Sequence, residues 1–149
     1  MYRHILVPTD GSQLSNKAAK TAAGLAKVFK AKITALHVIA PYSPPSGGDG
    51  VIMYAEAFSP QEYNQRMQKL ADKALAKVEA QARALKVACQ KLSVIEPAPW
   101  EAIIKVARSK RCDLIVMASH GRRGLTGLLL GSETHKVLTH SKTPVLVCR

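Results

Sequence analysis

Residues 113–132 read DLIVMASHGRRGLTGLLLGS, and this stretch decides the fold. It opens with DLIVM, a continuous apolar run of the kind that forms the buried centre of a parallel sheet. Glycines follow at positions 121, 124, 127 and 131, and Gly131-Ser132 opens a short helix that we expect to end near His140. A buried strand that leads through a glycine-rich turn into a helix is typical of α/β proteins.

Strand-like and helix-like segments alternate on both sides of this stretch. The segments that we expect to be strands are residues 4–9 (HILVPT), 33–39 (ITALHVI), 92–95, 113–117 and 144–147. We expect helices from about Ser12, from the capping box at Ser59-Pro60-Gln61-Glu62 to about Leu85, from Pro97-Ala98-Pro99 to about Ser109, and from about Ser132 to His140. Residues 41–58, rich in Pro, Ser and Gly, read as a long exposed loop. This order predicts an α/β fold in which a single doubly wound parallel sheet carries helices on both faces, as one domain over residues 1–149.

Composition excludes several classes of protein. No apolar run approaches the ~18 residues that a membrane span needs, and the apolar run at residues 5–7 is too short for a signal peptide, so we expect a cytoplasmic protein. Cys89, Cys112 and Cys148 are scattered, which argues against a disulfide framework and against a zinc site. The net charge of +12 comes largely from lysines that recur along two helices, and such charge is usually a solvated surface.

The residues that could bind a ligand follow directly after the first and fourth expected strands. Glycines let a backbone approach a ligand closely, and the free N–H groups and dipole at the helix that Gly131-Ser132 opens make an anion site worth roughly 0.3–2 kcal/mol for a phosphate. The Ser132 hydroxyl can cap this helix or donate to a phosphate oxygen, and Arg122 and Arg123 could add charge. After the first strand, the Asp10 carboxylate can meet an amine or hydroxyl at the top edge of the sheet. The simpler alternatives are a flexible glycine loop with a capped helix, and a turn aspartate that accepts backbone N–H bonds.

Three groups of residues then resemble the universal stress protein family. They are Val7-Pro8-Thr9-Asp10-Gly11-Ser12, Leu36-His37-Val38, and Ser119-His120-Gly121 followed by Leu129-Leu130-Gly131-Ser132, before a closing Pro-Val-Leu-Val strand. The resemblance covers essentially the whole chain and implies five strands in the order 3-2-1-4-5. The ATP-binding branch of the family carries G-x2-G-x9-G-S/T, which Gly121 and Gly131-Ser132 match, whereas Ala118 replaces the first glycine.

The resemblance also implies roles for individual residues. Asp10 would contact the adenosine part of the nucleotide, the backbone of Val38 the adenine edge, and Gly121, Gly131 and Ser132 the ribose and phosphates. The other residues that it places at the nucleotide are Pro8, Thr9, Met117, Ser119, His120, Arg122 and Glu133. It further implies a homodimer formed through the last strand, Val145–Val147.

These observations favour a regulatory or stress-response protein that binds an adenine nucleotide, ATP or else AMP or ADP, with little or no catalysis. Mg²⁺ would come with the phosphates. Neither a G-x-S-x-G elbow nor an H-E-x-x-H pair occurs, and no Gly-Lys-Ser/Thr of a Walker A loop is present. An alternative is a slow ATPase or another enzyme that uses adenine nucleotides, for which Asp10 and Glu133 are the carboxylates near the site. A nucleic-acid or anionic-surface binder is a third reading of the charge, although the aromatic content of 5% offers few stacking platforms.

Overall fold

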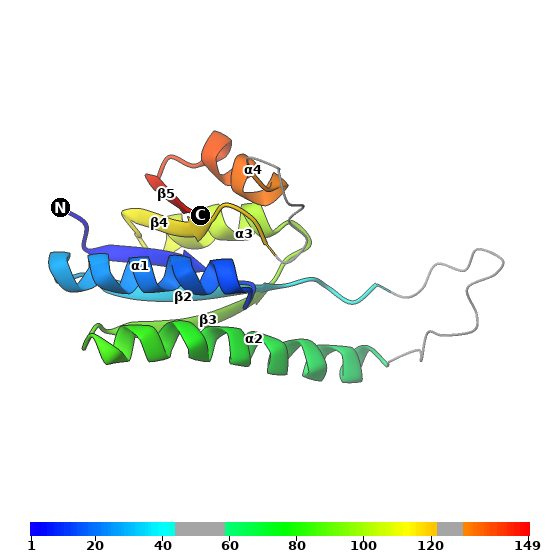
Figure 1. Cartoon of the computed structure of the whole chain (residues 1–149). Coiled ribbons are helices and arrows are strands. Elements are labelled where there is room, and N and C mark those ends of the chain that lie inside the picture. Colours follow the sequence, from blue (N-terminus) through cyan, green and yellow to red (C-terminus); the bar gives the residue numbers. More distant parts are fainter. Residues whose placement is uncertain (44–58, 122–129) are drawn as a thin grey trace.

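The structure, a computed structural model, describes residues 1–43, 59–121 and 130–149 (Figure 1). Its strands are β1 (His4–Pro8), β2 (Lys32–Ile39), β3 (Cys89–Ile95), β4 (Leu114–Ala118) and β5 (Val145–Cys148). Its helices are α1 (Gln13–Phe29), α2 (Pro60–Ala84), α3 (Pro99–Ser109) and α4 (Ser132–His140). Residues 44–58 of the expected long loop lie outside the described residues, as does most of the glycine-rich turn.

The five strands form one parallel sheet in the order β3-β2-β1-β4-β5, which confirms the expected α/β topology. From β1 the chain winds outward through β2 to the edge strand β3, and then returns across the sheet to β4 and β5. The winding direction therefore reverses between β1 and β4. In an open α/β sheet this reversal leaves a crevice at the carboxyl ends of the two strands, where ligands bind.

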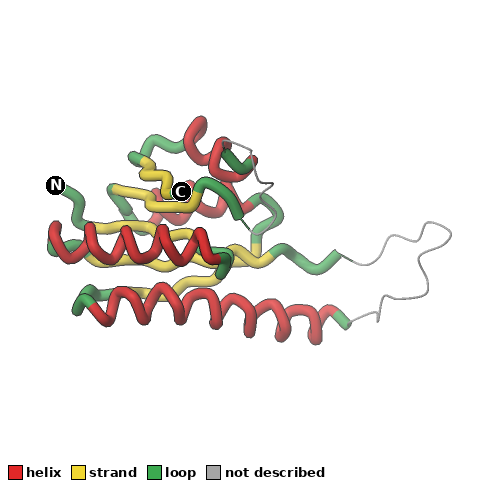
Figure 2. The backbone as a smooth tube through the Cα atoms, viewed as in Figure 1, coloured by secondary structure: helices red, strands yellow, loops and turns green. Residues whose placement is uncertain are grey.

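Two apolar clusters lie on opposite faces of the sheet, so the helices flank the strands as Figure 2 shows. One cluster joins α1 and α2 to alternate residues of the central strands, among them Ile5, Val7 and Val116. The other joins α3 and α4 to the intervening residues, among them Leu6 and Ile115. Because β1 and β4 are buried on both faces, they read as continuous apolar runs in the sequence.

The helix starts follow local capping chemistry. The Ser12 side chain accepts the Ser15 N–H at the start of α1, as expected. At α2, the Ser59 side chain accepts the Glu62 N–H while the Glu62 carboxylate accepts the Ser59 N–H, so the expected capping box is present. The N-cap of α4 is Gly131, which offers no side-chain hydrogen bond, so the first of the two roles considered for Ser132, capping this helix, is wrong.

All five strands differ from expectation at one end or both, most of all β3. β3 begins at Cys89, three residues before the expected start, because its first residues pair with β2 although Gln90 and Lys91 are exposed. An edge strand with polar, exposed residues carries a weak apolar signal. β1 ends at Pro8, so Thr9 becomes the first residue of the turn. No described helix is both long and apolar enough to cross a bilayer.

The buried imidazole of His4 should make stability depend on pH. Its Nε2 lies 2.8 Å from Thr34 Oγ1, and burial together with the nearby Lys32 ammonium lowers the pKa of His4 below 6.5. The unfolded chain therefore takes up this proton at a higher pH than the folded chain, and stability falls as the pH drops through and below 6.5. We expect His4→Gln to flatten the pH dependence of the free energy of unfolding between pH 7.5 and 5, measured by urea denaturation. Substitution of the exposed His135 by Gln is the control, and equal flattening in both variants would contradict the assignment.

Candidate functional site

The turns that follow β1 and β4 meet at the reversal of the sheet. An ideal Cβ placed on Gly121 would lie 3.0 Å from Oδ2 of Asp10. This is tighter than nine in ten real Cβ contacts, so a side chain at Gly121 would require the Asp10 carboxylate to shift. Asp10 and Gly121, 111 positions apart in the sequence, thus lie side by side.

Three hydrogen bonds hold the first turn in place. Asp10 Oδ1 accepts the Ser12 N–H at 3.0 Å, while Gly11 takes a left-handed φ of 81° and donates its N–H to Thr9 Oγ1 at 3.2 Å. His37 of β2 lies with Nδ1 2.8 Å from the Thr9 carbonyl oxygen. A carbonyl only accepts, so Nδ1 carries the proton and donates it. The Asp10 carboxylate is therefore presented from a turn anchored to two strands.

The backbone of Val38 faces this same edge. Successive residues of a strand direct their N–H and C=O to alternate sides. The Lys32 N–H and the Leu36 C=O both bond toward β1, so Val38, two residues further on, faces that side as well. The pairing of the two strands ends at Pro8 and Leu36. The Val38 N–H and C=O consequently point toward the crevice beyond the end of β1.

Gly131 closes the base of the glycine-rich turn. Its N–H donates to the Ser119 carbonyl oxygen at 2.8 Å. An ideal Cβ on Gly131 would lie 3.3 Å from that oxygen and 3.4 Å from Cα of His120, and both are backbone atoms that cannot easily move aside. Its φ of −72° suits any residue, so close packing rather than backbone conformation favours glycine here. The Gly131 amide is already used, and a ligand would approach this residue only through its bare Cα.

The next three backbone amides begin α4. The first backbone hydrogen bond of this helix joins the His135 N–H to the Gly131 carbonyl, so the N–H groups of residues 132–134 have no partner within the helix. The Thr134 hydroxyl donates to the Ala118 carbonyl at 2.9 Å and ties the helix start to the end of β4. Ser132 is exposed at this end. Three adjacent donors thus lie at the positive end of the helix dipole, where an anion would be favoured.

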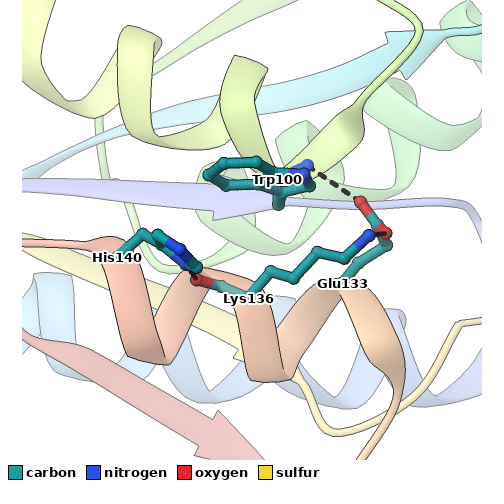
Figure 3. A network of polar contacts seen from close by, with 4 residues as sticks. All are labelled: Trp100, Glu133, Lys136 and His140. Atoms are coloured by element: carbon teal, nitrogen blue, oxygen red, sulfur yellow. Dashed lines mark hydrogen bonds and ion pairs between the residues drawn. The ribbon is translucent and has the colours of Figure 1, made fainter.

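Glu133 has a role that the sequence did not indicate. Its carboxylate accepts the backbone N–H of Trp100 at 2.9 Å and forms an ion pair of 3.3 Å with Lys136, as Figure 3 shows. Trp100 lies in the first turn of α3, whose Ala98 N-cap offers no side-chain oxygen. The Glu133 carboxylate thus supplies the cap that α3 lacks, and the Trp100 ring packs 4.8 Å from the His140 ring of α4. Although Glu133 lies at the expected position, its side chain is engaged with the neighbouring helix.

The side chain of His120 enters the same region. Its Nδ1 lies 3.0 Å from Oγ of the buried Ser119. Its Nε2 is buried and has no hydrogen-bond partner in the structure. A buried polar atom without a partner is rare in folded proteins and points to a group that completes it. The residues around the turn therefore fit a ligand with hydrogen-bonding oxygens.

Some of the remaining predicted residues lie in the described part of the chain and others lie outside it. Met117 is buried in the apolar cluster beneath α3 and α4. Ala118 is absent from the described residues with positive φ, so the alanine that replaces the family's first glycine sits in an ordinary conformation. Arg122 lies outside the described residues, as do Gly124 and Gly127. Within the described ranges, no three His, Cys, Asp or Glu side chains converge as metal ligands.

Substitution of three glycines by alanine should separate packing from backbone effects. Gly131→Ala would press a methyl against the main chain after β4, and we expect it to lower the free energy of unfolding by about 1–3 kcal/mol. Gly24→Ala is the control, because a Cβ there meets no atom within 4 Å. It should stabilise α1 by about 0.5–1 kcal/mol. Gly121→Ala should cost little, since only the Asp10 carboxylate must move. Urea denaturation measures all three, and a Gly131→Ala protein as stable as the wild type would contradict the packing argument.

Comparisons with known proteins identify the family and agree with the fold. The model of the universal stress protein family matches residues 1–149. Universal stress protein MJ0531 of Methanocaldococcus jannaschii is 32% identical over 153 residues, which cover 100% of this chain and 83% of the relative. The solved structure of MJ0577 from the same organism matches with a TM-score of 0.79 and 30% identity, covering 99% of this chain and 96% of the other. A universal stress protein solved in complex with cAMP matches with a TM-score of 0.69 and 25% identity, covering 98% and 95%. This chain therefore belongs to the universal stress protein family.

Proposed function

We propose that this protein binds an adenine nucleotide, with ATP as the expected ligand, in the crevice between the ends of β1 and β4. The observation that carries the proposal is the meeting of two kinds of groups at one sheet edge. Asp10 supplies an acceptor on one side, and the amides of residues 132–134, which have no partner within the helix, supply donors on the other. The cAMP complex of a relative with 25% identity supports this class of ligand.

Electrostatics set the orientation of the nucleotide. The negative charge of Asp10 repels phosphates and accepts hydrogen bonds from ribose hydroxyls, so the nucleoside lies at the β1 side. The phosphates lie at the start of α4, where the helix dipole favours negative charge. Of the residues expected at the ligand, Pro8 and Thr9 lie under the nucleoside, and Gly121 lies between its two ends.

The backbone of Val38 suits the adenine edge. Adenine presents an amino donor beside ring-nitrogen acceptors. The Val38 C=O and N–H point to the same side of β2 and form the complementary acceptor and donor. Main-chain recognition of this kind requires a strand that extends past its neighbour, as β2 extends past β1.

We propose a binding and regulatory role in the cytoplasm with little or no catalysis. The Glu133 carboxylate, one of the acidic groups on which an enzyme could draw, is occupied by the Trp100 N–H and Lys136. The Asp10 carboxylate is oriented by the Ser12 N–H. Any Mg²⁺ would arrive with the phosphates. Steady phosphate release at saturating ATP that Asp10→Ala abolishes would instead favour the slow ATPase.

Gly131→Val tests the site directly. The branched side chain would crowd the main chain at Ser119 and His120 and displace the start of α4, so we expect ATP affinity to fall at least about tenfold, measured by isothermal titration calorimetry. The Gly24→Ala protein is the control and should bind as the wild type does. Because Gly131→Val also stresses packing, circular dichroism should first show that the variant is folded at the titration temperature. A folded Gly131→Val protein with wild-type affinity would show that the site is wrongly assigned.

We further propose that the protein forms a homodimer through Val145–Val147. β5 is an edge strand that pairs with β4 alone within the described sheet, and its Leu146 is 38% exposed. Unpaired apolar edges favour strand pairing between chains, whereas lysine on an edge strand opposes it. We expect light scattering to give the mass of two chains for the wild type and of one chain for Leu146→Lys. A wild-type protein with the mass of one chain at micromolar concentration would contradict the dimer.

A further inference from the structure

The pair formed by Ser119 and His120 is incomplete in its hydrogen bonding. Ser119 Oγ and His120 Nδ1 lie 3.0 Å apart, and this is the one contact that the described residues offer the serine hydroxyl. Ser119 is 1% exposed, so water does not reach it freely. Nε2 on the far side of the imidazole ring is buried and without a partner. The location of the imidazole proton decides how many groups remain unsatisfied.

Two neutral arrangements are possible. If Nδ1 carries the proton and donates to Ser119 Oγ, the serine hydrogen has no acceptor and the Nε2 lone pair has no donor, so two groups stay unsatisfied. If the serine hydroxyl donates to Nδ1, its hydrogen is used and only the Nε2 N–H stays unsatisfied. Each unsatisfied buried polar group lowers the stability of the folded state. The second arrangement is therefore favoured, and Ser119 holds His120 as the tautomer protonated on Nε2.

The His120 ring lies beside Gly131, just before the start of α4. Cδ2, the ring carbon bonded to Nε2, lies 3.9 Å from an ideal Cβ on Gly131, the N-cap of α4. The amides of residues 132–134, without partners inside the helix, follow immediately along the chain. A buried N–H beside several free amides requires an acceptor with many lone pairs. A phosphate group supplies such an acceptor, whereas a nucleoside base or ribose hydroxyl, which must also donate, suits the site less well.

We infer that His120, set by Ser119 as a neutral donor, gives its Nε2–H to a phosphate oxygen of the bound nucleotide and so discriminates nucleotides from nucleosides. This inference rests on the proposed function. It assigns to Ser119 a positioning role, because its hydroxyl acts on the ligand only through the imidazole ring. The pair adds a neutral side-chain donor to the backbone amides of α4.

Two amide substitutions of His120 separate its two nitrogens. The side-chain nitrogen of glutamine can occupy the place of Nε2, while that of asparagine reaches only the place of Nδ1. Loss of a hydrogen bond to a charged group should lower the ATP affinity of His120→Asn about 10- to 100-fold, whereas His120→Gln should stay within about fivefold of the wild type. Adenosine affinity should be unchanged in both variants. His135→Asn, at an exposed position of α4, is the matched control and should not change ATP affinity.

A spectroscopic measurement tests the tautomer independently of binding. In the nucleotide-free protein at neutral pH, the ¹⁵N shifts of His120 should show Nε2 protonated and Nδ1 bare, and Ser119→Ala should remove this preference and lower ATP affinity. A dominant Nδ1-protonated form would overturn the inference. So would wild-type ATP affinity in His120→Asn, or an equal loss for ATP and adenosine. If the wild type binds adenosine and ATP with equal affinity or binds neither, the phosphate site of the proposed function fails and this inference falls with it. If His120→Asn still prefers ATP to adenosine as strongly as the wild type does, only the role assigned to His120 is wrong.

Discussion

The close packing of Gly131 against the main chain that leaves β4 is the constraint on which the site depends. Because no side chain intervenes, the Gly131 N–H reaches the Ser119 carbonyl at 2.8 Å, and the two ends of the glycine-rich turn are joined at its base. This contact determines where α4 begins. It also brings the His120 ring beside Gly131. The absence of a side chain at Gly131 thus joins the end of the central strand closely to the start of α4.

The sheet could be predicted because its signals are local. DLIVM at residues 113–117 is apolar on both faces, and such a strand has to lie in the middle of a parallel sheet between two layers of helices. The Ser59 capping box and the Ser12 cap depend on residues three positions apart, so sequence alone finds them. The prediction was weakest at the edge strand β3, whose first three residues carry no apolar pattern because pairing to β2, rather than burial, makes them a strand.

The site could be predicted only in part, because some of its contacts join residues far apart in sequence. The sequence placed Asp10, Gly121 and Gly131 after strands one and four, and the fold brings these turns together. It could not show that the Glu133 carboxylate turns to Trp100, 33 positions earlier, because that bond depends on how α3 packs against α4. A weak signal was available, since the alanine before Pro99 leaves α3 without a capping side chain. The bond from His37 to Thr9, 28 positions apart, likewise exists only once β2 lies beside β1.

The proposed nucleotide site depends on the direction of a few backbone amides. It is tested most directly by titrating ¹⁵N-labelled protein with ATP and following the amide resonances by NMR. We expect the resonances of the Val38 amide and of the amides of residues 132–134 to shift together, with the same dependence on ATP concentration. At the opposite edge of the sheet, a shallow hollow is lined by the first residues of three strands, among them His4, Lys32 and Cys89. Shifts confined to that hollow, with the start of α4 unperturbed, would contradict the account.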